Sequence, residues 1–456
     1  MCVKRTDYCS SKNANSLKQQ NYESYPKTMR VIADLHIHSR YSRATSQKMS
    51  IEEIARFARI KGLNLVGTGD FTHPKWLKEI QENLTFETDT GLYKVAKNPE
   101  LPVYFMTTTE VSTIFNFEND TKKIHHVILT PNIETAIQIN DRLAKYGDLA
   151  SDGRPTLNLD APHLVEEIMQ VSHENMIFPA HAWTPWFSIF GAFSGFNSIK
   201  ECYQDMTRHI HALETGLSSD PPMNWRLSKL DKFTLVSNSD SHSFWPWRLG
   251  REANVFYLEK PSYREIVNAI RLKDKEKFKF TIETDPSYGK YHWTGHRNCH
   301  VALSSQDAIK LGNVCPVCRR KLTKGVEQRV EELADRPTGF KPKDAIDFVH
   351  LLPLSEVIAT ALNVNSPSVQ QVWNIYNRLT EKFGNEYNVL LDASKEAMSH
   401  VTDEKIAEAI VRVREDRIKV VPGYDGVYGQ PIIFDESAKE KLVSQRVQQL
   451  NLTDFM

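Results

Sequence analysis

The feature that most constrains this fold is a series of short apolar runs that each end in, or carry, a side chain able to bind a metal. The runs are rich in β-branched residues, as strands are, and lie at 31–37, 63–69, 103–111, 124–130, 176–182, 211–216 and 233–240. Helix-like stretches separate most of them, and the clearest, 49–62, has Ser50 as its N-cap and Gly62 after its end. This alternation predicts a parallel sheet or a barrel, and seven strands predict a barrel one unit short of the TIM type. An open doubly wound sheet is less favoured, because no glycine-rich phosphate loop follows the first run.

The metal-capable side chains of these runs are expected to converge. His36 and His38 share one face of the first run because strand residues alternate, and in barrels of this kind the active site lies at the carboxyl ends of the strands. The candidate ligands are His36, His38, Asp70, His73, Glu110, one of His125 and His126, His181, Asp240 and His242. Glu214 is compatible with a ligand, with a support for a ligand or with a substrate contact. Mixed histidine and carboxylate ligands suit Zn, Mn or Fe, and a carboxylate between two ions is typical of hydrolytic sites, so we predict a multinuclear metal site.

A second group of candidate ligands lies at 284–337, where the sequence changes character. Two cysteines separated by two residues are typical of a zinc knuckle, and a third cysteine with a histidine three residues before it completes a tetrahedral set. This set, predicted to hold one structural zinc ion, is His296, Cys299, Cys315 and Cys318. Two further histidines, His292 and His300, are alternatives to His296. Six cysteines in 456 residues do not indicate a disulfide scaffold.

The chain as a whole has no net charge, with 57 basic and 57 acidic residues. A local basic face can nevertheless contact phosphate, and a basic run follows the cysteines. We predict phosphate contacts for Arg319, Arg320, Lys321, Lys324 and Arg329.

A content of 40% hydrophobic and 25% charged residues excludes a wholly disordered chain, and no stretch approaches the roughly 20 apolar residues of a membrane-spanning helix. The N-terminus has no apolar signal core, so a cytoplasmic location is expected.

Several of these segments resemble the successive motifs of the polymerase and histidinol phosphatase (PHP) family. They are ADLHIHS (33–39), Glu110, HVILTP (126–131), PAHA (179–182) and SDSH (239–242). The resemblance implies a distorted (β/α)7 barrel with two or three divalent ions (Zn, Mg or Mn), favours His126 as the ligand over His125, and implies catalytic roles for Glu110, His181, Asp240 and His242. The family often has a further histidine where this sequence reads SRYSRAT, and Thr-Asp-His where it reads Gly-Asp-Phe (69–71), so a third ion is less well supported.

Longer segments resemble the endonuclease Q family over nearly the whole chain after Met29. They are GTGDFTHP (67–74), TEVSTI (109–114), PAHAWTPWFSIFG (179–191), ETGLSSDPPMNWR (214–226), NSDSHS (238–243), CPVC (315–318) and GVEQRVEELADRP (325–337). The resemblance implies a metal-dependent DNA repair endonuclease that acts on double- or single-stranded DNA. It would cut on the 5′ side of deaminated bases (uracil, hypoxanthine, xanthine) and abasic sites, leaving a 3′-hydroxyl and a 5′-phosphate.

Enzymes that read a damaged base flip it out of the stack and hold it against aromatic or apolar walls. Trp183 and Trp186 follow the predicted ligand His181 directly and are therefore predicted to face DNA. Nearby phenylalanines, Phe193 among them, are expected to belong mostly to the core.

Two other functions share parts of this pattern. A small-molecule phosphatase such as histidinol phosphatase would share the barrel, but the cysteine module and the basic run would not serve a small substrate. A non-catalytic DNA-binding accessory protein, whose barrel has lost its metals, is opposed by the near-complete ligand set.

The last eight residues resemble a motif that binds a PCNA-type sliding clamp. The matching residues are Gln449, Leu452, Phe455 and Met456, three of which would fill an apolar pocket on the partner. The alternative is a terminal turn packed on its own domain, since short motifs often match by chance. A clamp of this type would imply an archaeal or eukaryotic cell, and the resemblance favours an archaeal one.

These patterns divide the chain into parts. Residues 1–28 are polar and lack hydrophobic periodicity, which predicts a disordered tail. The remaining parts are a catalytic barrel at 29–283, a zinc-binding module at 284–337, a mainly helical C-terminal domain at 338–446 and the clamp-binding motif at 449–456.

Overall fold

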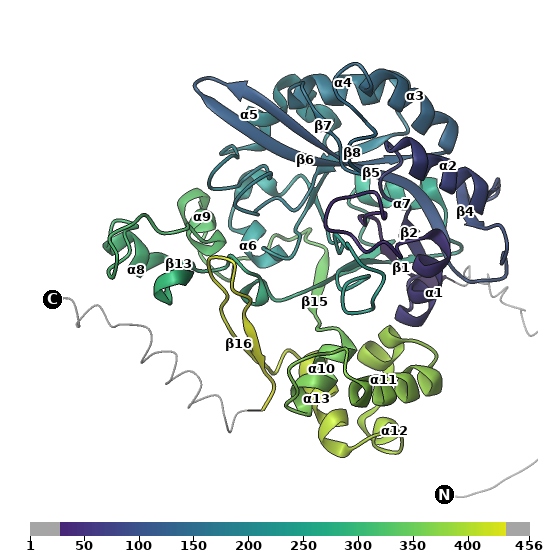
Figure 1. Cartoon of the computed structure of the whole chain (residues 1–456), viewed down its shortest axis with the longest axis vertical. Helices are drawn as coiled ribbons and strands as arrows, with labels where there is room; N and C mark the ends of the chain where they lie inside the picture. Colours follow the sequence, from purple (N-terminus) through teal and green to yellow (C-terminus); the bar gives the residue numbers. More distant parts are fainter. Residues whose placement is uncertain (1–27, 435–456) are drawn as a thin grey trace, which may run out of the picture.

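The structure is a computed structural model that describes residues 28–434. The predicted clamp-binding motif, and all but the last residue of the predicted N-terminal tail, lie outside the described residues. Figure 1 shows three regions: a large sheet-containing body with its flanking helices, a small module around β13 and α8, and a helical group around α10–α13. None of the helices in residues 28–434 combines the length and apolar character that crossing a membrane requires.

The predicted α/β barrel is confirmed, and each of the seven predicted runs forms a strand. The strands are β1 (Met29–Asp34), β2 (Leu65–Gly67), β5 (Tyr104–Phe117), β6 (Asp120–Thr130), β8 (Met176–Pro179), β9 (Ala212–Glu214) and β10 (Thr234–Val236). Hydrogen bonds join neighbouring strands in the order β1, β2, β5, β6 and β8, and β9 pairs separately with β10. Two isolated bridges, Ile177 with Ile210 and Ile37 with Ser241, connect this pair to β8 and to the end of β1, which closes the ring.

The distortion of the barrel comes from its third and fourth strands. β5 pairs antiparallel with the whole of β6, from Thr107 opposite Thr130 to Phe117 opposite Asp120, and the two form a long hairpin, because only two residues separate them. β6 also pairs antiparallel with β8, whereas β1 with β2, β2 with β5 and β9 with β10 are parallel. The all-parallel arrangement that the alternation of strands and helices predicts is therefore wrong for this part of the ring.

Further strands extend the sheet on both sides of the ring. β11 (Ala253–Leu258), β12 (Phe278–Glu283) and β15 (Asp347–His350) continue outward from β1. On the other side, β4 (Leu92–Val95) and β7 (Thr156–Leu157) pair with β5, and β3 (Leu84–Glu87) pairs with β4. One buried apolar cluster takes a side chain from each of the seven ring strands and from α7. This core holds the strands in place below the ends that carry the polar candidate ligands.

Helices connect the strands. They are α1 (Ile51–Lys61), α2 (Pro74–Asn83), α3 (Ile133–Leu143), α4 (Ala161–Val171), α5 (Ile199–Tyr203), α6 (Pro221–Trp225) and α7 (Tyr263–Arg271), with short 3-10 turns at Gln204–His209 and Ser228–Leu230. The predicted caps of α1 are confirmed: the Ser50 side chain accepts from the Glu53 N–H, and Gly62 takes the left-handed conformation, with φ 99°.

The rest of the chain forms the module and the helical region. The module contains 3-10 turns at Pro286–Tyr288 and Arg297–Cys299, with β13 (Thr294–His296), β14 (Val301–Leu303), α8 (Ser305–Lys310) and α9 (Val326–Leu333). The helical region contains α10 (Leu354–Ala361), α11 (Gln370–Phe383), a π-helical turn (Asn388–Asp392), α12 (Lys395–Ser399) and α13 (Glu404–Arg414). The hairpin of β16 (Lys419–Val421) and β17 (Gln430–Ile432) returns to the module, where Gly423 N donates to Ser287 O (Figure 1).

A buried ion pair joins the helical region to the barrel. Lys61, at the end of α1, lies 2.7 Å from Glu386, and both side chains are almost fully buried. Lys61 also donates to the carbonyl of Pro246, in the chain that follows the predicted ligands Asp240 and His242. The helical region therefore contacts the segment next to the candidate site.

Candidate metal centre

The strand ends bring the candidate ligands to one place. His36 and His38 follow β1, Glu110 lies within β5, and His181 and Asp240 follow β8 and β10. His181 and Asp240 have positive φ values of 26° and 48°, which non-glycine residues rarely adopt. Backbone strain of this kind gathers at functional sites, where the surrounding structure compensates for its cost.

The first group of donor atoms comprises His36, His38, Glu110 and Asp240, whose ligand atoms all lie within 4.8 Å of one another. Nε2 of His38 lies 3.2 Å from Oε2 of Glu110 and 3.0 Å from Oδ1 of Asp240. Nε2 of His36 lies 3.5 Å and 3.7 Å from the same two oxygens. Two imidazole nitrogens and two carboxylates thus face a common point.

The second group comprises Glu110, His125 and His181. Oε1 of Glu110 lies 2.9 Å from Nδ1 of His125 and 3.1 Å from Nε2 of His181, and these two nitrogens are 3.2 Å apart. Glu110 therefore turns one oxygen to each group. A carboxylate in this position is suited to bridge two metal ions.

The donor sets fit divalent cations. Nε2 of His36 is buried and has no hydrogen-bond partner within residues 28–434, and an unpaired buried polar atom is costly unless something else binds it. Histidine nitrogens and carboxylate oxygens are ligands that zinc and other transition metals accept. His36, His38, Glu110 and Asp240 would hold one ion, and Glu110, His125 and His181 a second.

Two buried carboxylates orient His38 and His36 by contacting Nδ1 of each ring. Asp70 accepts from Nδ1 of His38 at 2.9 Å, and its other oxygen accepts from the backbone N–H of Ser39. Glu214 lies 3.1 Å from Nδ1 of His36 and accepts from the backbone N–H of His181. A partner on Nδ1 leaves Nε2 free for the metal and fixes the ring orientation. Glu214 is therefore a support for a ligand, one of the three roles that the sequence left open.

Three predicted ligands lie outside both groups. Asp70 is engaged by His38 and Ser39, so its predicted role as a ligand is corrected to that of a support. His73 stacks on Tyr41 at 4.4 Å, at the start of α2, and does not join the site. His242 lies at the edge of the first group: its ring stacks on His38, and its Nε2 is 3.6 Å from Asp240.

The preference for His126 over His125 is wrong. Adjacent strand residues point to opposite faces, and it is His125 that faces Glu110. His126 is buried on the other side, where its two nitrogens lie 2.9 Å from the Thr113 hydroxyl and 2.8 Å from the Tyr203 hydroxyl. Burial lowers the pKa of His126 to about 3, so it is a neutral core histidine.

The charges of the site are strongly coupled. Burial alone would lower the pKa of His36, but Glu214 and Glu110 outweigh it and raise that pKa well above the ordinary value. Asp70 and Asp240 have the same effect on the pKa of His38. Metal binding at these histidines therefore competes with protonation.

Arg154 is a member of the site that sequence reasoning missed. Its Nη1 lies 3.0 Å from Oε2 of Glu110, and Glu110 and Asp240 outweigh the effect of burial and raise the pKa of its guanidinium. A single arginine in a polar loop carries no periodic or spacing signal, so the sequence offered no means of finding it.

The Cys/His cluster is assembled as the spacing predicts. His296, Cys299, Cys315 and Cys318 offer ligand atoms that all lie within 4.8 Å of one another. Nδ1 of His296 is 3.4 Å from the Cys318 sulfur. The knuckle turns tightly after Cys318, with Arg319 in the left-handed conformation at φ 61°. His292 and His300, the alternatives to His296, lie outside the cluster.

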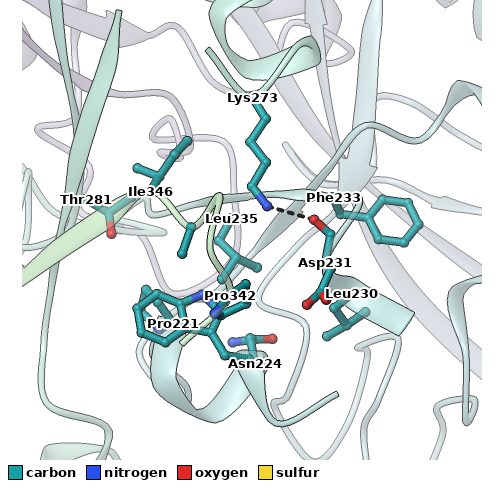
Figure 2. A pocket seen from close by; sticks show the side chains of 12 residues that line it. Pro221, Asn224, Leu230, Asp231, Phe233, Leu235, Lys273, Thr281, Pro342 and Ile346 are labelled. Atoms are coloured by element: carbon teal, nitrogen blue, oxygen red, sulfur yellow. Dashed lines mark hydrogen bonds between the residues drawn. The ribbon is translucent and has the colours of Figure 1, made fainter. Parts of the chain in front are cut away.

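A small cavity elsewhere in the molecule is not a substrate site. It lies between the barrel and the 342–346 segment, and Figure 2 shows its lining, with the Lys273 side chain donating to the carbonyl of Asp231. Its volume of about 20 Å³ holds little more than one water. None of the candidate ligands lines it.

Comparison with known proteins gives a match over nearly the whole chain. The crystal structure of PfuEndoQ, a lesion-specific endonuclease from Pyrococcus furiosus, is 37% identical, with a TM-score of 0.79, and the match covers 91% of this chain and 99% of that one. The chain belongs to the endonuclease Q family. A second crystal structure, of endonuclease Q with a 27-mer duplex substrate that has an abasic lesion at the active site, is 36% identical, with a TM-score of 0.79, and covers 90% of this chain and 98% of its own.

Other relatives of this endonuclease Q chain come from two organisms. Protein MJ0043 of Methanocaldococcus jannaschii is 34% identical over 257 residues, which are 55% of this chain and 31% of that protein, so the match spans about a third of that relative's length. Protein YqxK of Bacillus subtilis is 26% identical over 415 residues, 88% of this chain and 99% of its own. The family model of the MJ0043 C-terminal domain matches residues 353–417, which include α10–α13.

In this endonuclease Q chain the two tryptophans predicted to face DNA differ in their exposure to solvent. Trp183 is 1% exposed and its indole donates to Asn224, so its predicted role in DNA contact is wrong and it belongs to the core. Trp186 is 42% exposed. It stacks on Phe193, which is 41% exposed and so does not belong to the core as expected. Together they form an exposed aromatic pair near His181.

The basic residues predicted to contact phosphate also differ, because some are exposed and others are bound to protein groups. Arg319, Arg320 and Lys321 are exposed. Lys324 pairs with Glu332 at 2.6 Å. Arg329 donates to the carbonyls of Phe190 and Phe196, so it ties α9 to a barrel loop, and its predicted phosphate contact is corrected to this structural role.

Proposed function

We propose that this chain is a metal-dependent, lesion-specific DNA repair endonuclease that cuts the phosphodiester on the 5′ side of deaminated bases (uracil, hypoxanthine, xanthine) and abasic sites. The observation that carries the proposal is the match of nearly the whole chain to a lesion-specific endonuclease, together with the convergence of the ligand groups around Glu110. The relative with a lesion-containing duplex at its active site supports DNA as the substrate.

The chemistry follows from the donor sets. Divalent ions in such a site lower the pKa of a bound water and stabilise the charge that develops on the phosphate and on the leaving oxygen. Zn, Mg and Mn are the candidates, and two ions are what the two donor groups support. Glu110 sets the spacing between the groups, while Asp70 and Glu214 aim Nε2 of His38 and of His36.

The remaining parts of the chain are assigned to DNA binding and to structure. We assign one structural zinc to His296, Cys299, Cys315 and Cys318, a set with three thiolates that zinc favours. The exposed basic residues beside it, Arg319, Arg320 and Lys321, are positioned to contact phosphates, and Trp186 is available for stacking on a base.

The proposal is tested with end-labelled duplexes that contain one uracil, one hypoxanthine, one abasic site or no lesion, in the presence of Mg, Mn or Zn. We expect a single cut 5′ to the lesion, no cut in the plain duplex, and no cut by Asp240→Ala. Failure of metal-loaded wild-type protein to cut any of these duplexes would overturn the proposal, and turnover of only p-nitrophenyl phosphate would favour a small-molecule phosphatase.

A sliding-clamp partner is also proposed, on the sequence match of Gln449, Leu452, Phe455 and Met456. Phe455→Ala is expected to abolish co-elution with a PCNA-type clamp while leaving cleavage of short duplexes unchanged. Archaeal origin and a cytoplasmic location stay predictions, since one relative comes from Methanocaldococcus jannaschii and another from Bacillus subtilis.

A further inference from the structure

The mouth of the metal centre is defined by the few side chains of the site that solvent reaches. Glu110, His36 and His38 are at most 1% exposed. Asp240, His242 and Arg154 are 30%, 31% and 26% exposed. A substrate phosphate must therefore approach past these three groups, and Arg154 is the one that carries a permanent positive charge.

The loop that carries Arg154 is held rigidly against the site. Gly153 lies so close to Asp70 that a Cβ on it would come within 2.3 Å of the Asp70 carboxylate. The backbone N–H of Gly153 donates to Tyr41 O, and Pro155 O accepts from the N–H of Ser112 on β5. Bonds on both sides of Arg154 thus fix its backbone, with its side chain pointing toward Glu110.

Most of the hydrogen-bonding capacity of Arg154 is unused. A guanidinium has five N–H donors, and within residues 28–434 the only side-chain partner of Arg154 is Glu110, through Nη1. Arginine–carboxylate pairs are frequently bidentate, whereas Arg154 reaches Glu110 through Nη1 alone. The Arg154 side chain is 26% exposed, so a phosphate oxygen at the mouth could accept hydrogen bonds from its unused N–H groups.

We propose that Arg154 is a catalytic residue that binds a non-bridging oxygen of the scissile phosphate and stabilises the charge that develops there during hydrolysis. The proposal rests on the proposed endonuclease function. Arg154 would give the site a fixed positive charge next to the phosphate. Positioned arginines of this kind lower the barrier of phosphoryl transfer in other enzymes.

The test combines cleavage kinetics with product binding for wild type, Arg154→Ala, Arg154→Lys and the control Arg43→Ala. Arg43 is 87% exposed on a neighbouring segment and pairs with Asp152. We expect Arg154→Ala to lower kcat on a lesion duplex by about 100- to 1,000-fold, with metal content unchanged and KM changed less than kcat. Arg154→Lys is expected to recover only part of the rate, because lysine lacks the planar fork. Added guanidinium should restore part of the activity of Arg154→Ala, and Arg43→Ala should resemble wild type.

Equilibrium binding separates this inference from the proposed function. Metal-loaded wild type should bind a nicked duplex with a 5′-phosphate about tenfold more tightly than one with a 5′-hydroxyl, and Arg154→Ala should bind both equally. A kcat within about threefold of wild type, or a loss that excess metal fully reverses, would overturn the role of Arg154. Wild-type protein that prefers the 5′-phosphate and cuts no lesion duplex would instead overturn the proposed function alone.

Discussion

The two metal-binding regions of this chain differ in how they are built. The Cys/His cluster takes its four residues from 296–318, a short stretch of chain, and Cys318 is exposed. The barrel groups take theirs from His36 to Asp240, across most of the ring strands, and Glu110 at their centre is fully buried. One region is local in sequence and the other is assembled only by the closed sheet.

This difference matches two kinds of metal site. Four protein ligands close a tetrahedral site and leave no place for substrate, as in structural zinc sites. The second barrel group has three protein ligands, one of which is the shared carboxylate of Glu110, and this leaves coordination positions for water and phosphate. The comparison favours the proposed division of roles, in which the cluster stabilises the fold and the barrel performs the chemistry.

The largest effect is expected from Glu110→Gln, which removes the charge shared by both barrel groups. Cleavage of a lesion duplex should fall about 1,000-fold or more, and the barrel ions should be lost while the zinc of the Cys/His cluster stays. Metal content measured by mass spectrometry, together with cleavage rates, checks this. Glu118→Gln, in the exposed turn of the β5–β6 hairpin, is the control. Loss of all metal together would mean that the two sites are not independent.

A paired substitution sharpens the assignment within the barrel. His125→Asn should lower cleavage about 100-fold and weaken metal binding, because His125 faces Glu110. His126→Asn should keep its metals and instead lose about 1–3 kcal/mol of unfolding free energy, because the hydroxyls of Thr113 and Tyr203 lose a buried partner. Metal titration and thermal unfolding of both variants decide the matter, and the reverse pattern would restore His126 as the ligand.

Removal of a thiolate tests the structural role of the Cys/His cluster. Cys318→Ser should lose one zinc and become sensitive to proteolysis around 296–322, because a site of this kind is stable only with its metal. Cleavage of a lesion duplex should fall about tenfold through loss of the basic surface, while hydrolysis of bis(p-nitrophenyl) phosphate stays within about twofold. Cys202→Ala, at a buried cysteine outside the cluster, is the control. Equal losses on both substrates would contradict the division of roles.

Acid should release metal from the barrel. The pKa of His36 and of His38 is raised in the metal-free site, so metal binding there competes with protonation, and affinity falls as the pH falls. The expected change is up to about tenfold per pH unit for each displaced proton. In the Cys/His cluster the directions are opposed, because the backbone of Arg320 lowers the pKa of Cys318 while burial and the neighbouring thiols raise the pKa of Cys299 to about 11. Chelator competition at several pH values, with each ion counted, measures the dependence, and a barrel affinity that does not change with pH would contradict it.

The smallest effect concerns the basic surface. Combined Arg319→Ala, Arg320→Ala and Lys321→Ala should weaken DNA binding about fivefold and reduce the slope of log Kd against log salt by about two to three. Lys324→Ala should change the slope by less than about one, because Glu332 already holds that lysine. Fluorescence anisotropy over a range of salt measures both, and an unchanged slope in the triple variant would place the DNA elsewhere.

Much of the architecture was predictable because it depends on local patterns. The seven ring strands show as short β-branched runs, and the caps of α1 show as Ser50 and Gly62. The spacing of the cysteines and of the nearby histidine predicts the four residues that the structure places in one cluster, which are His296, Cys299, Cys315 and Cys318. In each case the signal is carried by residues close together in the chain.

Other features were decided only by the tertiary structure. The choice of His125 over His126 depends on which face of β6 turns inward, and that follows from its antiparallel pairing with β5 and β8. Asp70 orients His38 instead of facing an ion, because its two oxygens accept hydrogen bonds from His38 and Ser39. Arg154 reaches the site because Gly153 packs on Asp70.

The physical reason is the same for each of these features. Sequence spacing determines which side chains share a strand face or a tight turn, so it determined the strands, the Cys/His cluster and the set of metal-capable residues. Which donor atom faces an ion, which one holds its neighbour, and which ring is buried depend on contacts between strands far apart in the chain. Those contacts exist only once the ring has closed.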